Sequence, residues 1–265
     1  MNDNFNIHGF GNVLLSDLKG IAARKGISIL IFGLVPAVIF IMKLIFTFGS
    51  DGISNIDAGG RGFFFMAAAS VFIIWMPAAC YGHITDRKFG PYYTLIPASS
   101  AEKTLSMLLN MLIIVPAAFM LIYMSSDALI TLIAGSPLSE SLAVMIFSGS
   151  EYLSIPYSGS IADIFMVILN IFGYIMIFLT GAVWFRKNKI AMTILVNIAL
   201  GIIAMILITV MVKDDINMIS DNPDMTANWL TSFFGNFRTV TLVYLSVLVT
   251  GLAAAVYFRV KKIQY

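Results

Sequence analysis

Few residues of this sequence belong to the types that carry out catalysis, and their spacing matches no catalytic motif. The two histidines are His8, near the start of the chain, and His83, at the end of an apolar block. A zinc protease needs H-E-x-x-H and a serine hydrolase needs a histidine beside its nucleophile. The sequence has no H-E-x-x-H, no histidine near the Ser-Gly-Ser run at 158–160, and no G-x-x-x-x-G-K-[ST] loop for a nucleotide. We therefore predict no catalytic residue, no metal site, no cofactor and no enzymatic activity.

Polar side chains inside the apolar blocks are the next candidates for functional residues. Their transfer into lipid costs free energy, so those that are present usually serve a function. Lys43 is the ionisable residue that falls well within a block, and it is near enough to the block's outer end to reach the lipid headgroups. Anchoring is therefore favoured over a gating role. Asn110, Asn170 and Asn197 fit hydrogen bonds between helices as readily as substrate contact. So few buried charges argue against a carrier driven by protons or sodium.

The segment 83–103 carries the strongest local structure signals. It reads HITDRKFGPYYTLIPASSAEK, and its Gly-Pro pair interrupts any helix. Ser99 and Glu102 have the spacing of a capping box, in which the serine oxygen accepts from a free helix amide and the glutamate accepts from the serine amide. We expect a helix to begin at about Ser100, at or just below the membrane surface. The alternative is an ordinary loop that starts a helix well.

The composition indicates that the secondary-structure elements of this chain lie mainly in lipid. Hydrophobic residues make up 59% of the chain and charged residues 11%, against about half and about a quarter in soluble domains. The apolar residues form blocks long enough for helices to cross a hydrocarbon core of about 30 Å, and lipid leaves no partner for open backbone groups. We predict an all-α polytopic membrane protein, a single transmembrane domain over 1–265, with six spans at about 27–48, 62–82, 104–124, 161–185, 190–212 and 239–258.

The basic residues fall unevenly on the two sides of these spans. Twelve of the 16 lysines and arginines lie on the side of the termini, three lie on the other side and Lys43 lies within a span. The positive-inside rule therefore predicts that both termini are cytoplasmic. The first residues lack the features of a secretory signal, so the first apolar block is expected to be retained. A net charge of +2 gives no argument for a nucleic-acid partner.

Three segments outside the spans also carry apolar patterns. Residues 10–25 repeat apolar side chains on one helical face, which predicts an amphipathic helix along the inner membrane surface, with a solvated tail as the alternative. Residues 128–134 and 142–147 are too short to cross, and we expect them either to dip into the membrane interface or to cover the outer end of the bundle. Residues 213–238 are expected to form an outer loop whose aromatic residues lie at headgroup depth.

One short motif and the overall layout resemble a known family. Ile96, Pro97, Ala98 and Ser99, with Glu-Lys at 102–103, resemble a segment of small six-span bacterial permeases of the type-2 ABC exporter class, which carry Leu-Pro-Ala-Ser there. Isoleucine in place of leucine is a departure. The surface helix, six spans and inner termini also resemble that class. The resemblance implies a permease in the bacterial cytoplasmic (inner) membrane that pairs with a second permease subunit and is powered by a separate cytoplasmic ATP-binding subunit.

The resemblance further implies that the ATP-binding subunit contacts the loop between spans two and three. Adjacent tyrosines and an apolar pair suit this role, because rigid apolar anchors bind well in a groove of a partner. Glu102 and Lys103 are expected to stay near the membrane side. The predicted coupling residues are Tyr92, Tyr93, Leu95, Ile96, Pro97, Ser99, Glu102 and Lys103.

We therefore predict the membrane-spanning permease subunit of an ATP-driven ABC exporter. Its expected partners are the ATP-binding subunit, a second permease subunit of the same or a related chain, and the lipid bilayer. One alternative is a non-transporting immunity, assembly or regulatory subunit. Another is a channel or secondary carrier. The substrate is left open among lipid-linked compounds, peptides and drug-like amphiphiles.

Overall fold

The computed structural model describes most of the chain, namely residues 5–46, 57–86, 90, 93, 95–148, 161–221 and 223–264. These residues are overwhelmingly helical and include no strand. Five helical stretches among them are long and apolar enough to cross a membrane, and a sixth is obtained when one bent helix pair counts as a single span. The all-α polytopic fold predicted from the sequence is confirmed.

The described residues form mainly α-helices, together with two short 3₁₀ segments and one π-helical turn. In chain order they are α1 (Ile7–Gly33), α2 (Val35–Phe46), α3 (Ala58–Tyr81), η1 (Gly82–Thr85), α5 (Ser100–Leu109), η2 (Asn110–Ile114), α6 (Val115–Ile133), η3 (Leu138–Glu140), α7 (Leu142–Ser148), α8 (Ile161–Trp184), α9 (Lys189–Asp221) and α10 (Pro223–Gln264).

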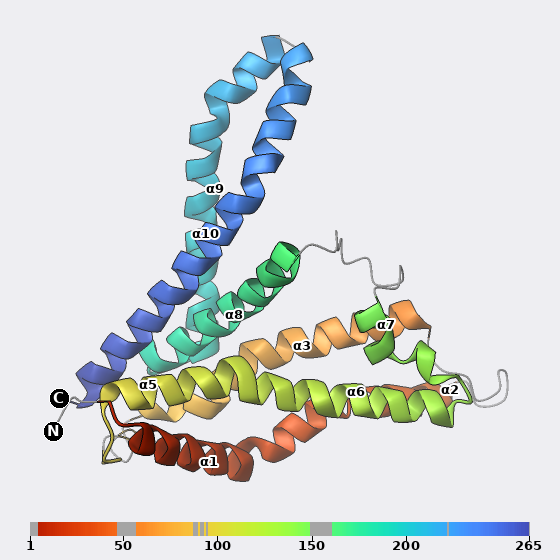
Figure 1. Ribbon diagram of the computed structural model, residues 1–265, viewed down its shortest axis with the longest axis vertical. Helices are drawn as coiled ribbons and strands as arrows, with labels where there is room; N and C mark the ends of the chain where they lie inside the picture. The colour runs from red at the N-terminus through yellow and green to blue at the C-terminus, as the bar shows by residue number, and fades with distance from the viewer. Residues whose placement is uncertain are drawn as a thin grey trace.

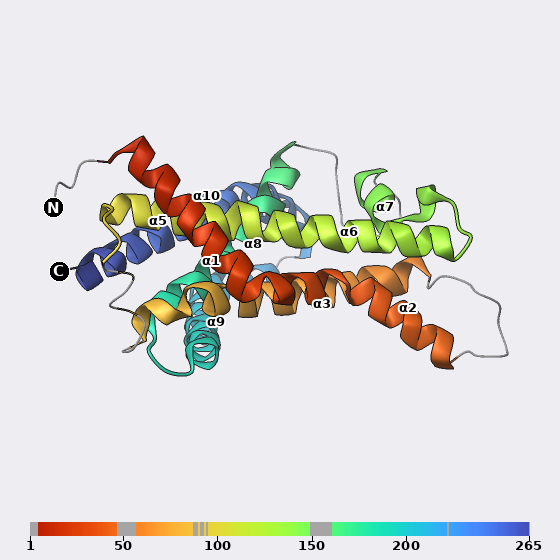
Figure 2. The same ribbon diagram turned by 90° about the horizontal axis from the view of Figure 1, so that it is seen from below.

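Helices α3 and α6 pack through aromatic rings that belong to the buried core. The rings of Phe72 and Phe119 are stacked with centroids 4.4 Å apart, and Phe65 meets the edge of Tyr123 at 5.1 Å. Such pairs add to the apolar burial of the rings. Figure 2 shows α1 crossing the layer formed by α3 and α5–α6, and it shows the first turn of α1 and the last turn of α10 at the same end of the molecule.

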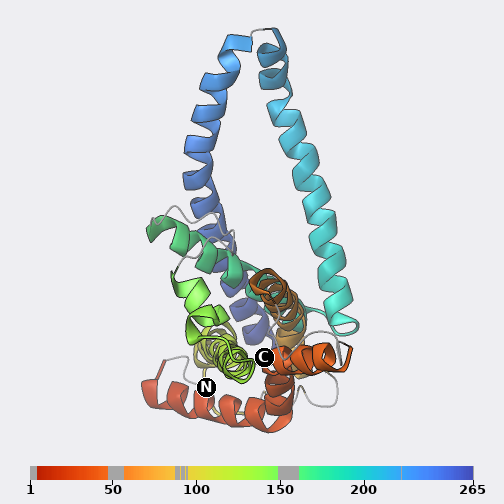
Figure 3. The ribbon, with the colours of Figure 1, turned by 90° about the vertical axis from the view of Figure 1, so that its right-hand side faces the viewer.

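Helices α9 and α10 form a long hairpin. Figures 1 and 3 show its two arms rising away from the other helices. The expected outer loop at 213–238 is therefore wrong, because α9 runs to Asp221 and α10 begins at Pro223. Proline suits the first position of a helix, where its missing N–H is not needed. The side chains of 210–238 lie outside the described residues, and with them the expected aromatic cluster.

The boundary expected between a surface helix ending at residue 25 and a span starting at residue 27 is also wrong. Helix α1 runs unbroken from Ile7 to Gly33, and the break follows at Leu34, where α1 and α2 meet at 45°. Pro36 explains this position, because its ring lacks an N–H and collides with the carbonyl four residues earlier. Within α1 the apolar face is the one turned toward the protein: Ile21 is buried, Leu14 is half-buried, and the residues opposite are exposed.

Gly33 lies where α1 touches α6, and a side chain there has no room. A Cβ at Gly33 would overlap the side chain of Ile122, while the Gly33 carbonyl accepts a 2.8 Å hydrogen bond from Ser126 Oγ. Gly33→Ala is expected to lower the free energy of unfolding by about 1–3 kcal/mol. Gly26→Ala in the same helix is the control, since nothing lies within 4 Å of its Cβ. Thermal unfolding in detergent measures both, and equal losses would contradict this packing.

The third span is longer than the sequence suggested. It runs as 34 residues from Ser100–Ile133, about 50 Å at 1.5 Å per residue. Residues 128–134, expected at the membrane interface or over the outer end of the bundle, are its last turns and the residue after them, and Gly135 with φ 76° ends the helix. Residues 142–147 fall in the short helix α7. A π-helical turn, η2, interrupts the span just before Pro116, whose missing N–H disturbs the regular bonding.

Candidate functional site

The start of α5 is capped as the sequence predicts. The hydroxyl of Ser99 accepts from the amide of Glu102 at 3.3 Å, and the carboxylate of Glu102 accepts from the amide of Ser99 at 3.1 Å. Both halves of the capping box are present, and the helix begins at Ser100. The same carboxylate accepts from the amide of Asn6 at 2.8 Å. A Cβ at Gly9 would approach this carboxylate to 2.9 Å, so glycine permits the start of α1 to lie against the start of α5.

Lys103 and Tyr93 are buried together behind this cap. The side chain of Lys103 is fully buried; its ammonium donates to the carbonyl of Tyr93 at 3.1 Å and lies 5.4 Å from the centre of the Tyr93 ring. Burial raises the pKa of Tyr93 well above its ordinary value, so the phenol stays neutral. A buried ammonium must be paired or hydrogen bonded. Tyr93 is therefore buried and is not available as the anchor for a partner that the sequence predicted.

Glu102 is 3% exposed, and its carboxylate is bound to two backbone amides. The accessible part of the segment is apolar. Leu95 is 75% exposed and Pro97 is exposed, while Ile96 packs against the core and its carbonyl accepts from the amide of Ala98 at 2.8 Å. Tyr92 lies outside the described residues. The surface formed by Leu95 and Pro97 is called the apolar tip below.

Removal of the Ser99 hydroxyl tests how firmly the cap holds the apolar tip. Ser99→Ala is expected to lower the free energy of unfolding by about 0.5–2 kcal/mol, because one helix amide loses its acceptor. Ser70→Ala is a matched control, since the Ser70 hydroxyl donates only to the carbonyl of Met66 in its own helix. Hydrogen exchange of the first amides of α5 should accelerate in the Ser99 variant. Unchanged exchange there would show that the cap does not order the segment.

A buried polar network joins α1, α3, α5 and η2 directly beyond the cap. Ser106 Oγ donates to Asp17 at 2.7 Å, and Asn110 Nδ2 donates to the hydroxyl of Tyr81 at 3.0 Å. Asn110 therefore forms a hydrogen bond between helices. Asn197 instead donates to a carbonyl of its own helix. Asp17 interrupts the apolar stripe of α1 because it faces this network.

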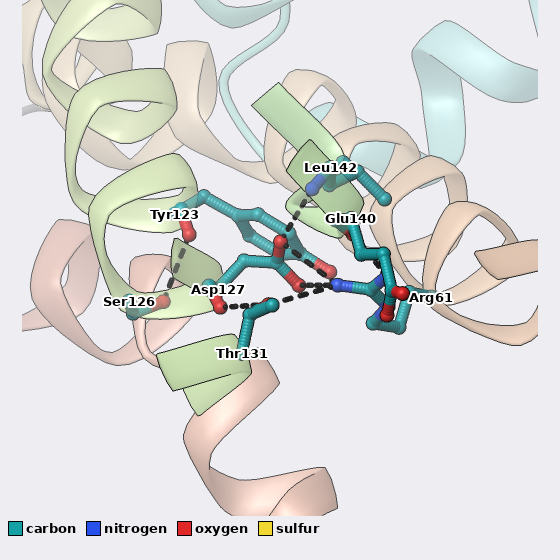
Figure 4. A network of polar contacts seen from close by, with 7 residues as sticks. All are labelled: Arg61, Tyr123, Ser126, Asp127, Thr131, Glu140 and Leu142. Atoms are coloured by element: carbon teal, nitrogen blue, oxygen red, sulfur yellow. Dashed lines mark hydrogen bonds and ion pairs between the residues drawn. The ribbon is translucent and has the colours of Figure 1, made fainter. Parts of the chain in front are cut away.

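A second polar network lies at the opposite end of the molecule, where sequence reasoning placed no site (Figure 4). The guanidinium of Arg61 in α3 lies 3.3 Å from the carboxylate of Asp127 in α6. It also donates to Thr131 Oγ1 at 3.1 Å and to the backbone carbonyl of Glu140. Asp127 accepts in addition from the amide of Leu142, the first residue of α7, at 2.7 Å. One ion pair therefore fastens α3, α6, η3 and α7 together.

Arg61 and Asp127 are 8% and 2% exposed, and a buried ion pair is sensitive to the loss of either partner. Among the described residues, Arg61 Nε has no hydrogen-bond partner. The adjoining cavity of about 20 Å³ has room for about one water molecule. One feature of the sequence could have indicated this ion pair. Arg61 comes just before one expected span and Asp127 just after the next, both on the side that is otherwise poor in basic residues.

The described residues thus define a multi-pass, all-α membrane protein with one capped, tightly held segment at one end and one buried ion pair at the other. Comparison with protein families, with curated proteins and with solved structures finds no significant match to this chain.

Proposed function

We propose that this chain is the membrane-spanning permease subunit of an ATP-driven exporter of the type-2 ABC class. It would lie in the bacterial inner membrane with both termini cytoplasmic, pair with a second permease subunit and take its energy from a separate ATP-binding subunit. The support is the basic-residue asymmetry, the resemblance at 96–103 and the placement of the ends of α1 and α10 at one end of the molecule. Export, rather than another direction of transport, rests on the resemblance.

The apolar tip is the observation that carries the proposal. Leu95 is 75% exposed, yet the described residues near it are held by the capping box, by the Lys103 bond to Tyr93 and by the Glu102 bond to Asn6. An exposed apolar side chain on an ordered support suits a contact that a partner completes. Because α5, η2 and α6 form one helical stretch from Ser100–Ile133, movement of the tip would be transmitted to the third span.

Site-specific cross-linking tests this assignment. Cys80 is the only cysteine and is buried, so Leu95→Cys in a Cys80→Ala background gives one reactive thiol for a photo-cross-linker. When the chain is co-expressed with its ATP-binding subunit, the thiol at Leu95 should cross-link to that subunit. The control is Leu138→Cys, an exposed position in η3 at the other end of the molecule. Cross-linking from both positions, or from neither, would contradict the proposal.

A further inference from the structure

A groove of about 520 Å³ lies between α8, α9 and α10. This volume falls within the roughly 300–1,000 Å³ that is usual for small-molecule sites. The groove is accessible from the side, because little of α9 between Lys189–Ile206 is buried within the protein. Its walls are mainly apolar and include Ile177, Val196, Leu200, Leu248 and Leu252.

More of the polar lining side chains lie at one end of the groove than at the other. Thr180, Trp184 and Thr193 line it beside the connection from α8 to α9, with Asn197 one turn further on. Ala204 and Tyr244 line the other end, where Ala204 is about 16 Å along α9 from Thr193 at 1.5 Å per residue. A molecule with a polar head and a long apolar tail matches this distribution.

Positive charge gathers at the polar end. The guanidinium of Arg259 lies 5.8 Å from the centre of the Trp184 ring. Arg186 and Lys187 are exposed and directly follow Phe185, which lines the groove. No acidic residue lines the groove in the part of the chain that the structure describes. This end of the groove, beside the last turn of α8, therefore attracts an anion.

A second copy of the chain is poorly suited to supply that anion. Asp86 pairs with Lys189 at 2.8 Å, Asp17 accepts from Ser106, and Glu102 is bound to two backbone amides. Among the described residues, these three carboxylates lie at the same end of the molecule as the basic end of the groove. Each already has a partner within its own chain.

We propose that this groove binds an anionic phospholipid of the adjacent leaflet, with the headgroup at Arg186, Lys187 and Arg259 and one acyl chain along α9. Basic clusters between helices at this membrane surface are suited to anionic headgroups, since the lipid brings its charge to the depth of the basic side chains. The site requires only this chain and does not depend on the proposed transport function.

Fluorescence of Trp184 reports on the occupant directly. The variant Trp75→Phe/Trp229→Phe retains Trp184 alone, and it is placed in vesicles of phosphatidylcholine that contain brominated phosphatidylglycerol or brominated phosphatidylcholine as quencher. The anionic lipid should bind beside Trp184 more tightly, by about fivefold for each basic residue that contacts the headgroup. Phe63→Trp in a chain without other tryptophans is the control, because Phe63 is exposed on α3 at the other end; it should show no preference.

Two variants separate the headgroup contact from the groove. Arg186→Gln/Lys187→Gln leaves Arg259 on Trp184 and should reduce the preference for the anionic lipid. Gly201→Phe should weaken quenching by both lipids, because it fills the groove at a position where a Cβ meets no atom within 4 Å. Equal quenching by both lipids in the unaltered groove would overturn the proposal in favour of ordinary lipid contact. Quenching by neither lipid would also overturn it, and would show that protein covers the groove.

Discussion

Asp127→Ala is expected to lower the free energy of unfolding by about 3–5 kcal/mol, because it leaves the guanidinium of Arg61 buried without its charge partner. The loss should be large because Asp127 also accepts from the amide of Leu142, so α7 loses its attachment to α6 in the same step. Chemical or thermal unfolding in mild detergent measures the effect. Proteolysis should also reach α7 sooner in the variant than in the wild type.

Two further variants show whether the ion pair is the cause. Glu140→Gln should be close to neutral, since Glu140 contributes only its backbone carbonyl to Arg61. The double variant Arg61→Met/Asp127→Leu should recover most of the lost stability, because apolar residues of similar size can replace a buried pair. If Asp127→Ala proves as stable as Glu140→Gln, the network does not hold α3 and α6 together.

Leu95→Asp is expected to reduce binding of the ATP-binding subunit at least about tenfold, the effect of losing roughly 1.4 kcal/mol at a central apolar anchor. The side chain is 75% exposed, so a charge there should leave insertion and stability unchanged. The measurement is the amount of ATP-binding subunit that co-purifies with wild-type and variant chains at equal expression. ATP hydrolysis by the recovered complex should fall in parallel.

Leu138→Asp is the matched control, because Leu138 is 50% exposed and lies at the other end of the molecule. It should co-purify with the ATP-binding subunit as the wild type does. Tyr93→Ala is unsuitable as a docking variant, since Tyr93 is buried and its loss would alter the fold itself. If a stable Leu95→Asp protein still binds the ATP-binding subunit as the wild type does, the segment 95–97 is an ordinary loop and not the docking surface.

Local sequence signals predicted the parts of the fold that depend on near neighbours. Apolar blocks of sufficient length gave the helical membrane class, and the Ser99 to Glu102 spacing gave the start of α5. Pro36 is the sequence signal for the bend after α1. The bend was not predicted because Pro36 lies within a continuous apolar run that indicates a single span. The helical course of 213–221 and 223–238 was missed because the charged and polar residues there are typical of a loop.

The candidate site was harder to predict because its contacts join distant parts of the chain. Arg61 and Asp127 are 66 positions apart, and Asn6 and Glu102 are 96 apart. No periodicity within a single helix indicates such pairs. The burial of Lys103 was missed for a related reason, since a lysine beside a membrane span is ordinarily expected to reach the headgroups, whereas here the carbonyl of Tyr93 satisfies it within the fold.

The mass of the complex isolated in mild detergent tests the proposed function most directly. Co-expression with the ATP-binding subunit should yield an assembly that contains two membrane subunits and the ATP-binding subunit and hydrolyses ATP. Leu95→Asp should yield the membrane subunits without it. A stable, functional single chain that never associates with an ATP-binding subunit would contradict the assignment as an exporter permease.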